Sequence, residues 1–234
     1  MSCFDFKQFR ISHTHSFKVG TDAVLLGAWA EIPQTGAILD VGCGSGIVTL
    51  MLAQRTQALI TGIDIQPESI VEARENALAS PFAERITLMC QDLLTFTPPT
   101  PFDCIVSNPP YYEEDTPSPV AETNTAKHTM GSLTFEDLAG HATRLLKDDG
   151  RFQVILPSQA YTRFADIAQR HRLYLIQATS VRTTEKKAAK RHLLCFQKSA
   201  GHTPHPIFNS ICLQTDGGER SRAYRELTKD FYLW

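Results

Sequence analysis

The six residues S-N-P-P-Y-Y at positions 107–112 combine an amide, two prolines and two aromatic rings directly after the apolar segment Phe102–Val106. The side-chain oxygen of the asparagine can accept one hydrogen of a planar amino group, and the next backbone carbonyl can accept the other. The prolines restrict the backbone and keep that carbonyl aimed, and the first tyrosine offers a face on which a flat substrate can stack. This pattern indicates chemistry on an amino group, with an ordinary turn at a strand end as the alternative. The candidate catalytic residues are Asn108, Pro109, Pro110 and Tyr111.

A second cluster, D-V-G-C-G-S-G at 40–46, places glycines at alternate positions after another apolar segment. Glycine allows a sharp backbone turn and a close approach to a ligand. A dinucleotide-binding fingerprint would require one more glycine where this chain has Ile47, so the spacing argues against NAD. The phosphate-binding motif G-x-x-x-x-G-K-[ST] does not occur in the chain. The alternative is a tight strand-to-helix turn without a ligand.

Two acidic residues follow the next two predicted strands. Asp64 lies 18 residues after Gly46, where a carboxylate can accept hydrogen bonds from both hydroxyls of a ribose. Asp92 can accept a hydrogen bond from an adenine amino group while Leu93 packs against the ring. Together with the glycines, these acids predict a site for an adenosine that carries no phosphate. The alternative for Asp92 is a capping or solvated acid, and we interpret Asp40 as a residue that orients the loop or touches the ligand.

Strands and helices alternate from residue 37 to residue 171, which predicts a doubly wound α/β fold with helices on both faces of a parallel sheet. In such a fold ligands bind at the carboxyl ends of the strands, and the fourth strand lies beside the first, so Asn108 would adjoin the glycine cluster. Two further strands complete a mostly parallel, seven-stranded sheet, and the tail is predicted to be an amphipathic helix. The predicted strands are 37–42, 59–65, 85–89, 102–106, 151–156, 173–181 and 191–197, and the predicted helices are 46–55, 67–79, 133–146, 158–171 and 224–234.

The bulk composition excludes several classes of protein. The 234 residues carry a net charge of −2, so any nucleic-acid site must be a local patch. The apolar runs fall short of the roughly 18–20 residues of a membrane span, and the N-terminus lacks a signal-peptide pattern. The six cysteines form no C-x-x-C pair, so we expect reduced thiols in the core of a cytoplasmic protein without a metal site. We also expect a monomer.

D-V-G-C-G-S-G, I-D-I at 63–65 and Q-D-L at 91–93 resemble, in this order, three motifs of the class I S-adenosyl-L-methionine-dependent methyltransferases. The resemblance implies a Rossmann-like core that binds S-adenosyl-L-methionine through these motifs. N-P-P-Y resembles the catalytic motif of amino methyltransferases, which act on adenine N6 in DNA and RNA or on a glutamine amide in release factors. The motif leaves both substrates open because each presents a planar amino group. The implied cofactor-binding residues are Asp40, Gly42, Cys43, Gly44, Gly46, Asp64, Ile65, Asp92, Leu93 and Asn108.

Both ends of the chain favour the nucleic-acid substrate. F-K-V-G-T-D-A-V-L-L-G-A-W-A at 17–30 and L-T-K-D-F-Y-L-W at 227–234 resemble the ends of bacterial adenine-N6 methyltransferases of valine tRNA. Those enzymes act on the purine immediately 3′ of the anticodon. This resemblance implies that Thr21 and Asp22 lie near the methionine end of the cofactor. The alternative role for these two residues is to cap the helix that follows them.

The length of the N-terminal segment separates the two substrates further. The glutamine-modifying enzymes carry a substantial helical domain before the glycine cluster, whereas only 36 residues precede Ala37 here. We therefore expect an N-terminal extension, 1–36, packed on a methyltransferase domain, 37–234. The expected reaction is methylation of adenine N6 in tRNA. The alternatives are a glutamine-amide or other amino methyltransferase with the same core, and a binding module that has lost activity.

An RNA partner requires local positive charge, and the segment 182–192 between the last two predicted strands supplies it. Phosphate contacts from such a loop would orient the RNA and make its affinity depend on salt. A solvated hairpin is the alternative. The candidate RNA-binding residues are Lys186, Lys187, Lys190, Arg191 and His192.

Overall fold

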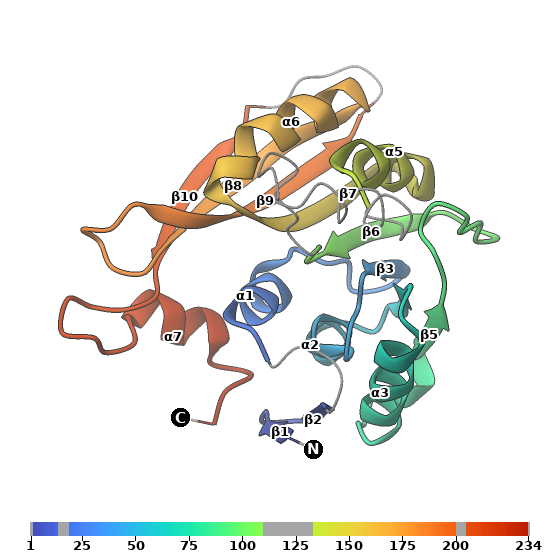
Figure 1. Ribbon diagram of the computed structural model, residues 1–234, viewed down its shortest axis with the longest axis horizontal. Helices are drawn as coiled ribbons and strands as arrows, with labels where there is room; N and C mark the ends of the chain where they lie inside the picture. Colours follow the sequence, from blue (N-terminus) through green and yellow to red (C-terminus); the bar gives the residue numbers. More distant parts are fainter. Residues whose placement is uncertain (1, 14–18, 110–132, 200–204, 234) are drawn as a thin grey trace, which may run out of the picture.

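The computed structural model describes residues 2–13, 19–109, 133–199 and 205–233, which form one eight-stranded sheet, a separate two-stranded hairpin and flanking helices (Figure 1). The hairpin consists of β1 (Ser2–Asp5) and β2 (Arg10–His13). The strands of the main sheet are β3 (Ala37–Val41), β4 (Leu59–Asp64), β5 (Ile86–Cys90), β6 (Phe102–Ser107), β7 (Leu146–Pro157), β8 (Leu173–Arg182), β9 (Ala189–Lys198) and β10 (Ile207–Cys212). The helices are α1 (Thr21–Trp29), α2 (Ile47–Arg55), α3 (Pro67–Leu78), α5 (Phe135–Leu145), α6 (Tyr161–Arg170) and α7 (Arg222–Thr228), with short 3-10 turns at Ala83–Arg85 and Ser158–Ala160.

The main sheet is doubly wound around β3, as the alternation of strands and helices predicts. Its strand order is β10-β8-β9-β7-β6-β3-β4-β5, and β9 is the strand that runs antiparallel to both of its neighbours. β3 pairs in parallel with β4 on one side and with β6 on the other. The chain therefore reverses its direction of winding between β3 and β6, which is where such folds bind ligands.

The sheet has eight strands rather than the seven that the sequence predicts. The additional strand, β10, pairs in parallel with β8 at the edge of the sheet. Its first four residues are exposed, so the segment lacks the buried apolar run that identifies the inner strands. The tail helix also differs from the prediction for 224–234, because α7 ends at Thr228 and begins earlier, where the Ser221 hydroxyl accepts a hydrogen bond from the Tyr224 amide.

The cysteines are free thiols, but the expectation that they lie in the core holds for only some of them. Cys43, Cys104 and Cys195 are buried, whereas Cys3 and Cys90 are exposed. No described helix combines the length and the apolar character that spanning a membrane requires.

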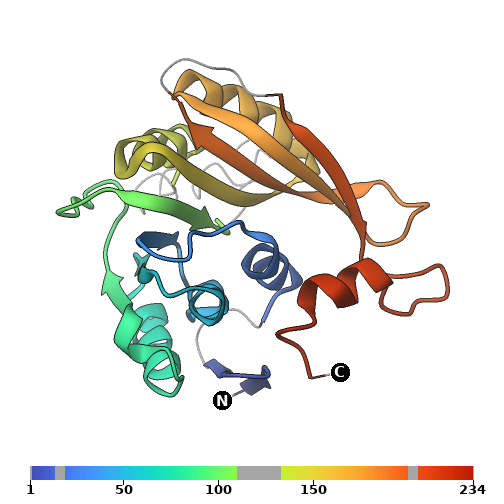
Figure 2. The same cartoon turned by 180° about the vertical axis from the view of Figure 1, so that it is seen from behind.

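Helices cover both faces of the sheet, with α5 and α6 on one face and α1, α2 and α7 on the other (Figure 1, Figure 2). The central strand β6 shows why both faces must be covered. Cys104 and Val106 pack into the core beneath α1 and α2, whereas Phe102 and Ile105 pack beneath α5 and α6. A strand that is buried on both faces consists of a continuous run of apolar residues, so its position could be predicted from the sequence.

A buried amide fixes the end of α1 against the sheet. Gln153 of β7 is 0% exposed, and its side chain accepts a hydrogen bond from the Glu31 amide at 2.8 Å and donates one to the Glu31 carbonyl at 2.7 Å. The Arg55 guanidinium of α2 donates to the carbonyls of Gly27 and Ala30, at 2.7 and 2.8 Å. These bonds satisfy the last carbonyls of α1, which have no partner inside the helix.

We expect Gln153→Leu to lower the free energy of unfolding by about 2–4 kcal/mol, because it leaves the amide and carbonyl of Glu31 without their partners. Denaturant unfolding at neutral pH measures the change. Gln177→Leu is a matched control, because Gln177 is a half-buried glutamine of β8 whose side chain makes no hydrogen bond with any described residue. Equal losses in the two variants would contradict this role for Gln153.

Candidate active site

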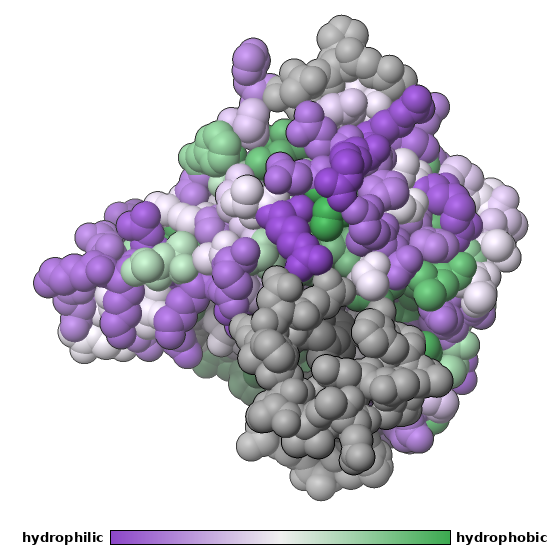
Figure 3. Space-filling model, turned by 45° about the horizontal axis from the view of Figure 1, so that its top comes forward, coloured by the Kyte–Doolittle hydropathy of each residue, from purple (hydrophilic) through white to green (hydrophobic). Residues whose placement is uncertain are grey.

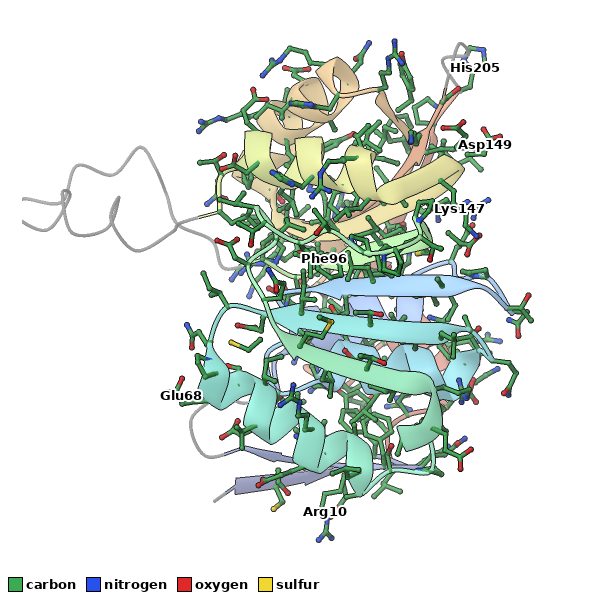
Figure 4. The ribbon with its side chains drawn as sticks, turned by 90° about the vertical axis from the view of Figure 1, so that its right-hand side faces the viewer. Arg10, Glu68, Phe96, Lys147, Asp149 and His205 are labelled. Carbon is green, nitrogen blue, oxygen red and sulfur yellow. The ribbon has the colours of Figure 1, made fainter. Side chains whose placement is uncertain are left out.

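The candidate site residues gather at one edge of the sheet, because the parallel strands β3, β4, β5 and β6 all end there. Figure 4 shows the sheet from the side, with Glu68, just after β4, near this edge and Lys147 and Asp149, at the start of β7, near the opposite one. The glycine cluster follows β3, Asp64 ends β4, Asp92 follows β5 and Asn108 follows β6. One edge therefore carries all four of the groups that the sequence singles out.

The glycine loop turns in a conformation that side chains disfavour. Gly42, Gly44 and Gly46 have φ values of 71°, 53° and 84°, a region that glycine adopts without steric cost. The amides of Gly42 and Cys43 both donate to the carbonyl of Ile63, at 2.9 and 3.0 Å. Among the described residues, a Cβ atom added at Gly42 or Gly44 would meet nothing within 4 Å, whereas one at Gly46 would lie 3.3 Å from the Cβ of Ala73. No described residue thus occupies the space above its first two glycines, where a ligand can approach the backbone.

Asp64 holds the glycine loop in place from the neighbouring strand. One carboxylate oxygen accepts a hydrogen bond from the Gly44 amide and the other accepts one from the Gln66 amide, both at 2.9 Å. Each carboxylate oxygen can accept more than one hydrogen bond, so the group can also receive the hydroxyls of a ribose. The next residue, Ile65, is 53% exposed and provides an apolar surface for a ring at this edge.

Asp92 and Leu93 follow β5 at the same edge. One carboxylate oxygen of Asp92 accepts a hydrogen bond from the Leu94 amide at 2.9 Å, a contact of the same kind as the one between Asp64 and the Gln66 amide. Leu93 is buried in the core beneath α5 and α6. Ile65, rather than Leu93, is the exposed apolar side chain at this part of the edge.

Asp40 and Cys43 support the loop from below. Asp40 is 1% exposed and accepts a hydrogen bond of 2.6 Å from the Thr49 hydroxyl of α2. Burial raises the pKa of Asp40 to about 7, although the hydrogen bonds from Thr49 oppose this shift. The Cys43 side chain packs beside Ile70 and Ala73 of α3, and burial raises the pKa of its thiol. Cys43 can therefore offer a ligand its backbone, while its side chain belongs to the core.

Asn108 and Pro109 lie beside the glycine loop, as the topology predicts. The Ser107 hydroxyl donates to the Val41 carbonyl at 2.9 Å, and the same two residues are paired between β6 and β3. Asn108 is half-buried and follows directly, level with the start of the glycine loop, and Pro109 is buried. The other two candidate catalytic residues, Pro110 and Tyr111, lie outside the described residues.

The structure joins two residues that the sequence assigns to different ligands. The Arg191 Nε of β9 donates to the Asp22 carboxylate of α1 at 2.8 Å, and both side chains are about one-third exposed or less. Asp22 and Arg191 therefore neutralise each other, so neither residue offers an unpaired charge to a cofactor or to RNA. The expectation that Thr21 or Asp22 caps α1 is wrong, because Gly20 occupies the cap position and the helix has no side-chain cap.

The predicted RNA-binding cluster divides into three environments. Lys187 and Lys190 are exposed, and Lys186 pairs with Asp216 at 2.7 Å. His192 is half-buried against Tyr161, and burial lowers the pKa of its imidazole. Adjacent residues of a strand point to opposite faces, which explains why His192 meets α6 while its neighbour reaches α1.

Sequence reasoning missed a second group of cations near this hairpin. Arg220, Arg222, Arg225 and Lys229 line a shallow hollow of about 520 Å³ beside α7, together with two acidic residues. The hollow adjoins the β8–β9 hairpin, because Gln214 forms a β-bridge with Arg220 and donates its amide to the Thr183 carbonyl. In Figure 3 the projecting part of the molecule that carries this hairpin is largely hydrophilic. Within the described residues, no group of His, Cys, Asp and Glu side chains is arranged to hold a metal ion.

We expect Asp40→Asn to change how stability depends on pH. The carboxyl ionises near pH 3.8 in the unfolded chain and near pH 7 in the folded one, so its stabilising contribution is complete below pH 3.8 and is lost as the pH rises through about 7. Between pH 5 and pH 8.5 the variant should gain about 2–3 kcal/mol relative to the wild type. Denaturant unfolding at the two pH values measures this difference, and parallel pH profiles would contradict the assignment.

The chain matches known proteins over nearly its full length. A model of the methyltransferase domain family matches residues 34–210. A tRNA1(Val) (adenine(37)-N6)-methyltransferase from Phocaeicola vulgatus is 41% identical over 231 residues, which are 98% of this chain and 97% of that protein. A protein of the same name from Pectobacterium carotovorum subsp. carotovorum is 39% identical over an alignment of 236 positions, which covers 99% of this chain and 94% of that protein.

Solved structures share the fold at much lower identity. A protein described as a predicted O-methyltransferase from Agrobacterium tumefaciens has a TM-score of 0.70 at 20% identity, covering 90% of this chain and 96% of its own. A ribosomal protein L11 methylase from Lactobacillus delbrueckii subsp. bulgaricus has a TM-score of 0.56 at 19% identity, covering 79% and 82%. By its fold, its domain match and its full-length relatives, the chain belongs to the methyltransferase domain family and, within it, to the tRNA1(Val) (adenine(37)-N6)-methyltransferases.

Proposed function

We propose that this protein transfers a methyl group from S-adenosyl-L-methionine to N6 of adenosine 37 in valine tRNA. The names of its full-length relatives support this substrate and give no support to a glutamine amide. The observation that carries the proposal is the position of Asn108, which follows β6 directly beside the glycine loop of β3. An acceptor of amino hydrogens is thereby placed next to the open space above Gly42 and Gly44.

The cofactor fits the residues at this edge. When bound, S-adenosyl-L-methionine supplies a methyl group that its sulfonium activates. We assign the ribose hydroxyls to Asp64, one face of the adenine to Ile65 and the adenine amino group to Asp92. The close approach of the methionine part is assigned to the glycine loop, where a Cβ atom at Gly44 would enter open space.

Asn108 and Pro109 would prepare the amino group of the target adenine. Its nitrogen is a poor nucleophile, because its lone pair is delocalised into the ring. The Asn108 side-chain oxygen would accept one of its hydrogens and the Pro109 carbonyl the other. These two hydrogen bonds favour a pyramidal nitrogen whose lone pair is available. Both hydrogen bonds strengthen as positive charge develops on the nitrogen, which is the condition for catalysis. In this proposal Pro110 stiffens the same segment and Tyr111 stacks on the base.

The tRNA would approach from the β8–β9 hairpin, which extends from the same edge. β9 runs antiparallel to both β7 and β8, so β8 runs in the same direction as β7 and β6 and ends at the edge where they end. Lys187 and Lys190 are exposed there and suit phosphate groups. The enzyme must splay the target base out of the anticodon loop, which costs a few kcal/mol that these contacts offset. The proposal includes a monomer that acts in the cytoplasm, with residues 1–36 as an extension of the domain formed by 37–234.

We expect Asn108→Ala to reduce methyl transfer to tRNA by at least about 100-fold, because one of the two acceptors is lost in the transition state. Its dissociation constant for S-adenosyl-L-methionine, measured by calorimetry, should stay within a few-fold of the wild-type value. Asn209→Ala is the matched control, since Asn209 is an exposed asparagine on β10. Loss of cofactor binding in Asn108→Ala would show that the residue has another role.

We expect the double variant Lys187→Ala/Lys190→Ala to bind tRNA more weakly and with a smaller dependence on salt. Removing two phosphate contacts should reduce the slope of log K against log salt by about 1–2. Fluorescence titration with tRNA at several salt concentrations measures the slope. Arg10→Ala, which removes a cation on the β1–β2 hairpin (Figure 4), should leave the slope unchanged. An unaltered slope in the double variant would exclude this hairpin as the phosphate-binding surface.

A further inference from the structure

Two aromatic side chains stack on each other near the edge that carries Asn108. The rings of Tyr161 and His192 have centroids 4.7 Å apart and planes inclined by 22°. Tyr161 is the first residue of α6, just after the short turn that follows β7. His192 is paired with Leu156 near the carboxyl end of β7. The pair therefore lies at the carboxyl edge, where the candidate active site is.

The strand register sets the distance between this pair and the candidate catalytic residue. β7 lies between β6 and β9, with Ser107 opposite Val154 and His192 opposite Leu156. Asn108 and His192 are thus nearly level and two strand spacings apart, which is about 10 Å. One nucleotide of an RNA strand can span this distance from a base held at Asn108.

His192 departs from the pattern of its own strand. Leu194 and Phe196 lie on the same face of β9 and are buried in the apolar core. His192 continues that row toward the edge, yet its buried Nδ1 has no hydrogen-bond partner among the described residues. A leucine or phenylalanine would avoid the cost of an unpaired polar atom. Local departures of this kind are expected at functional sites.

The pair is uncharged near neutral pH. Burial lowers the pKa of the His192 imidazole and raises the pKa of the Tyr161 phenol. An uncharged imidazole attracts phosphate less strongly than the lysines of the predicted basic cluster do. Both side chains are half-buried, so the pair presents an aromatic surface without charge. Such surfaces receive unstacked nucleobases in RNA recognition.

We propose that Tyr161 and His192 form a stacking ledge for the base of a nucleotide that adjoins the target adenosine. They act as positioning residues, which hold the splayed anticodon loop so that the target base reaches Asn108. This inference rests on the proposed function and adds a second base-binding site to it.

A fluorescent base tests the stacking directly. Valine tRNA is prepared with 2-aminopurine on the 5′ or on the 3′ side of the target adenosine and is titrated with protein and S-adenosylhomocysteine. With the wild type we expect quenching at one of these positions, because stacking on an aromatic ring quenches 2-aminopurine. Tyr161→Leu should lose this quenching, whereas Tyr161→Phe and His192→Phe, which keep the rings, should retain it. The proposal would be overturned if Tyr161→Leu and the wild type quenched the 2-aminopurine fluorescence equally, or if the wild type quenched it at neither position.

Methylation rates separate a failure of this inference from a failure of the proposed function. Tyr161→Leu should lower kcat/KM for tRNA about 10-fold or more, with an unchanged melting temperature and unchanged affinity for S-adenosyl-L-methionine. Tyr161→Phe should keep the wild-type value. If the wild type methylates tRNA and Tyr161→Leu does so equally well, the ledge is wrong and the proposed function stands. If the wild type methylates no tRNA, both are wrong.

Discussion

The hydrogen bond from the Gly44 amide to the Asp64 carboxylate is the interaction on which the rest of the site depends. It fastens a loop with positive φ at Gly42, Gly44 and Gly46 to the end of the neighbouring strand. Because this loop turns so tightly, α2 starts immediately after it, and none of the described side chains fills the space above its first glycines. That space lies beside Asn108, since β6 is paired with β3. A cofactor and a planar amino group can therefore meet there.

Buried polar groups hold the glycine loop in position, and they lower the stability of the folded protein. Asp40 is almost completely buried beneath the loop, and its raised pKa means that its ionised form costs free energy near neutral pH. Gln153 of β7 and Arg191 of β9 have a related role farther along the sheet, where they fix the two ends of α1 through Glu31 and Asp22. Two departures from a purely apolar core, Asp40 and Ser107, lie at the candidate site, as expected where function constrains the sequence.

The sequence predicted the parts of the fold whose local pattern matches their burial. β3, β4 and β6 are apolar runs closed by Gly42, Asp64 and Asn108, so both the strands and the edge they share could be predicted. β10 could not, because an exposed edge strand carries no buried pattern.

Contacts between residues that are far apart in the sequence could not be predicted either. Arg191 and His192 form one basic cluster in the sequence, but the alternation of a strand sends them to opposite faces, toward Asp22 and Tyr161. The pairing of Arg191 with Asp22 and the stacking of His192 on Tyr161 depend on how β9 packs against α1 and α6, so finding them required the structure.

The central claim is that the amino group methylated at this edge belongs to an adenine in tRNA. The most direct test incubates the protein with labelled S-adenosyl-L-methionine and either a valine tRNA or a release factor, then identifies the labelled product by mass spectrometry. The account predicts N6-methyladenosine in the anticodon-loop fragment of the tRNA and no label in the release factor. Methylated glutamine in the release factor, with unlabelled tRNA in both native and transcribed form, would contradict it.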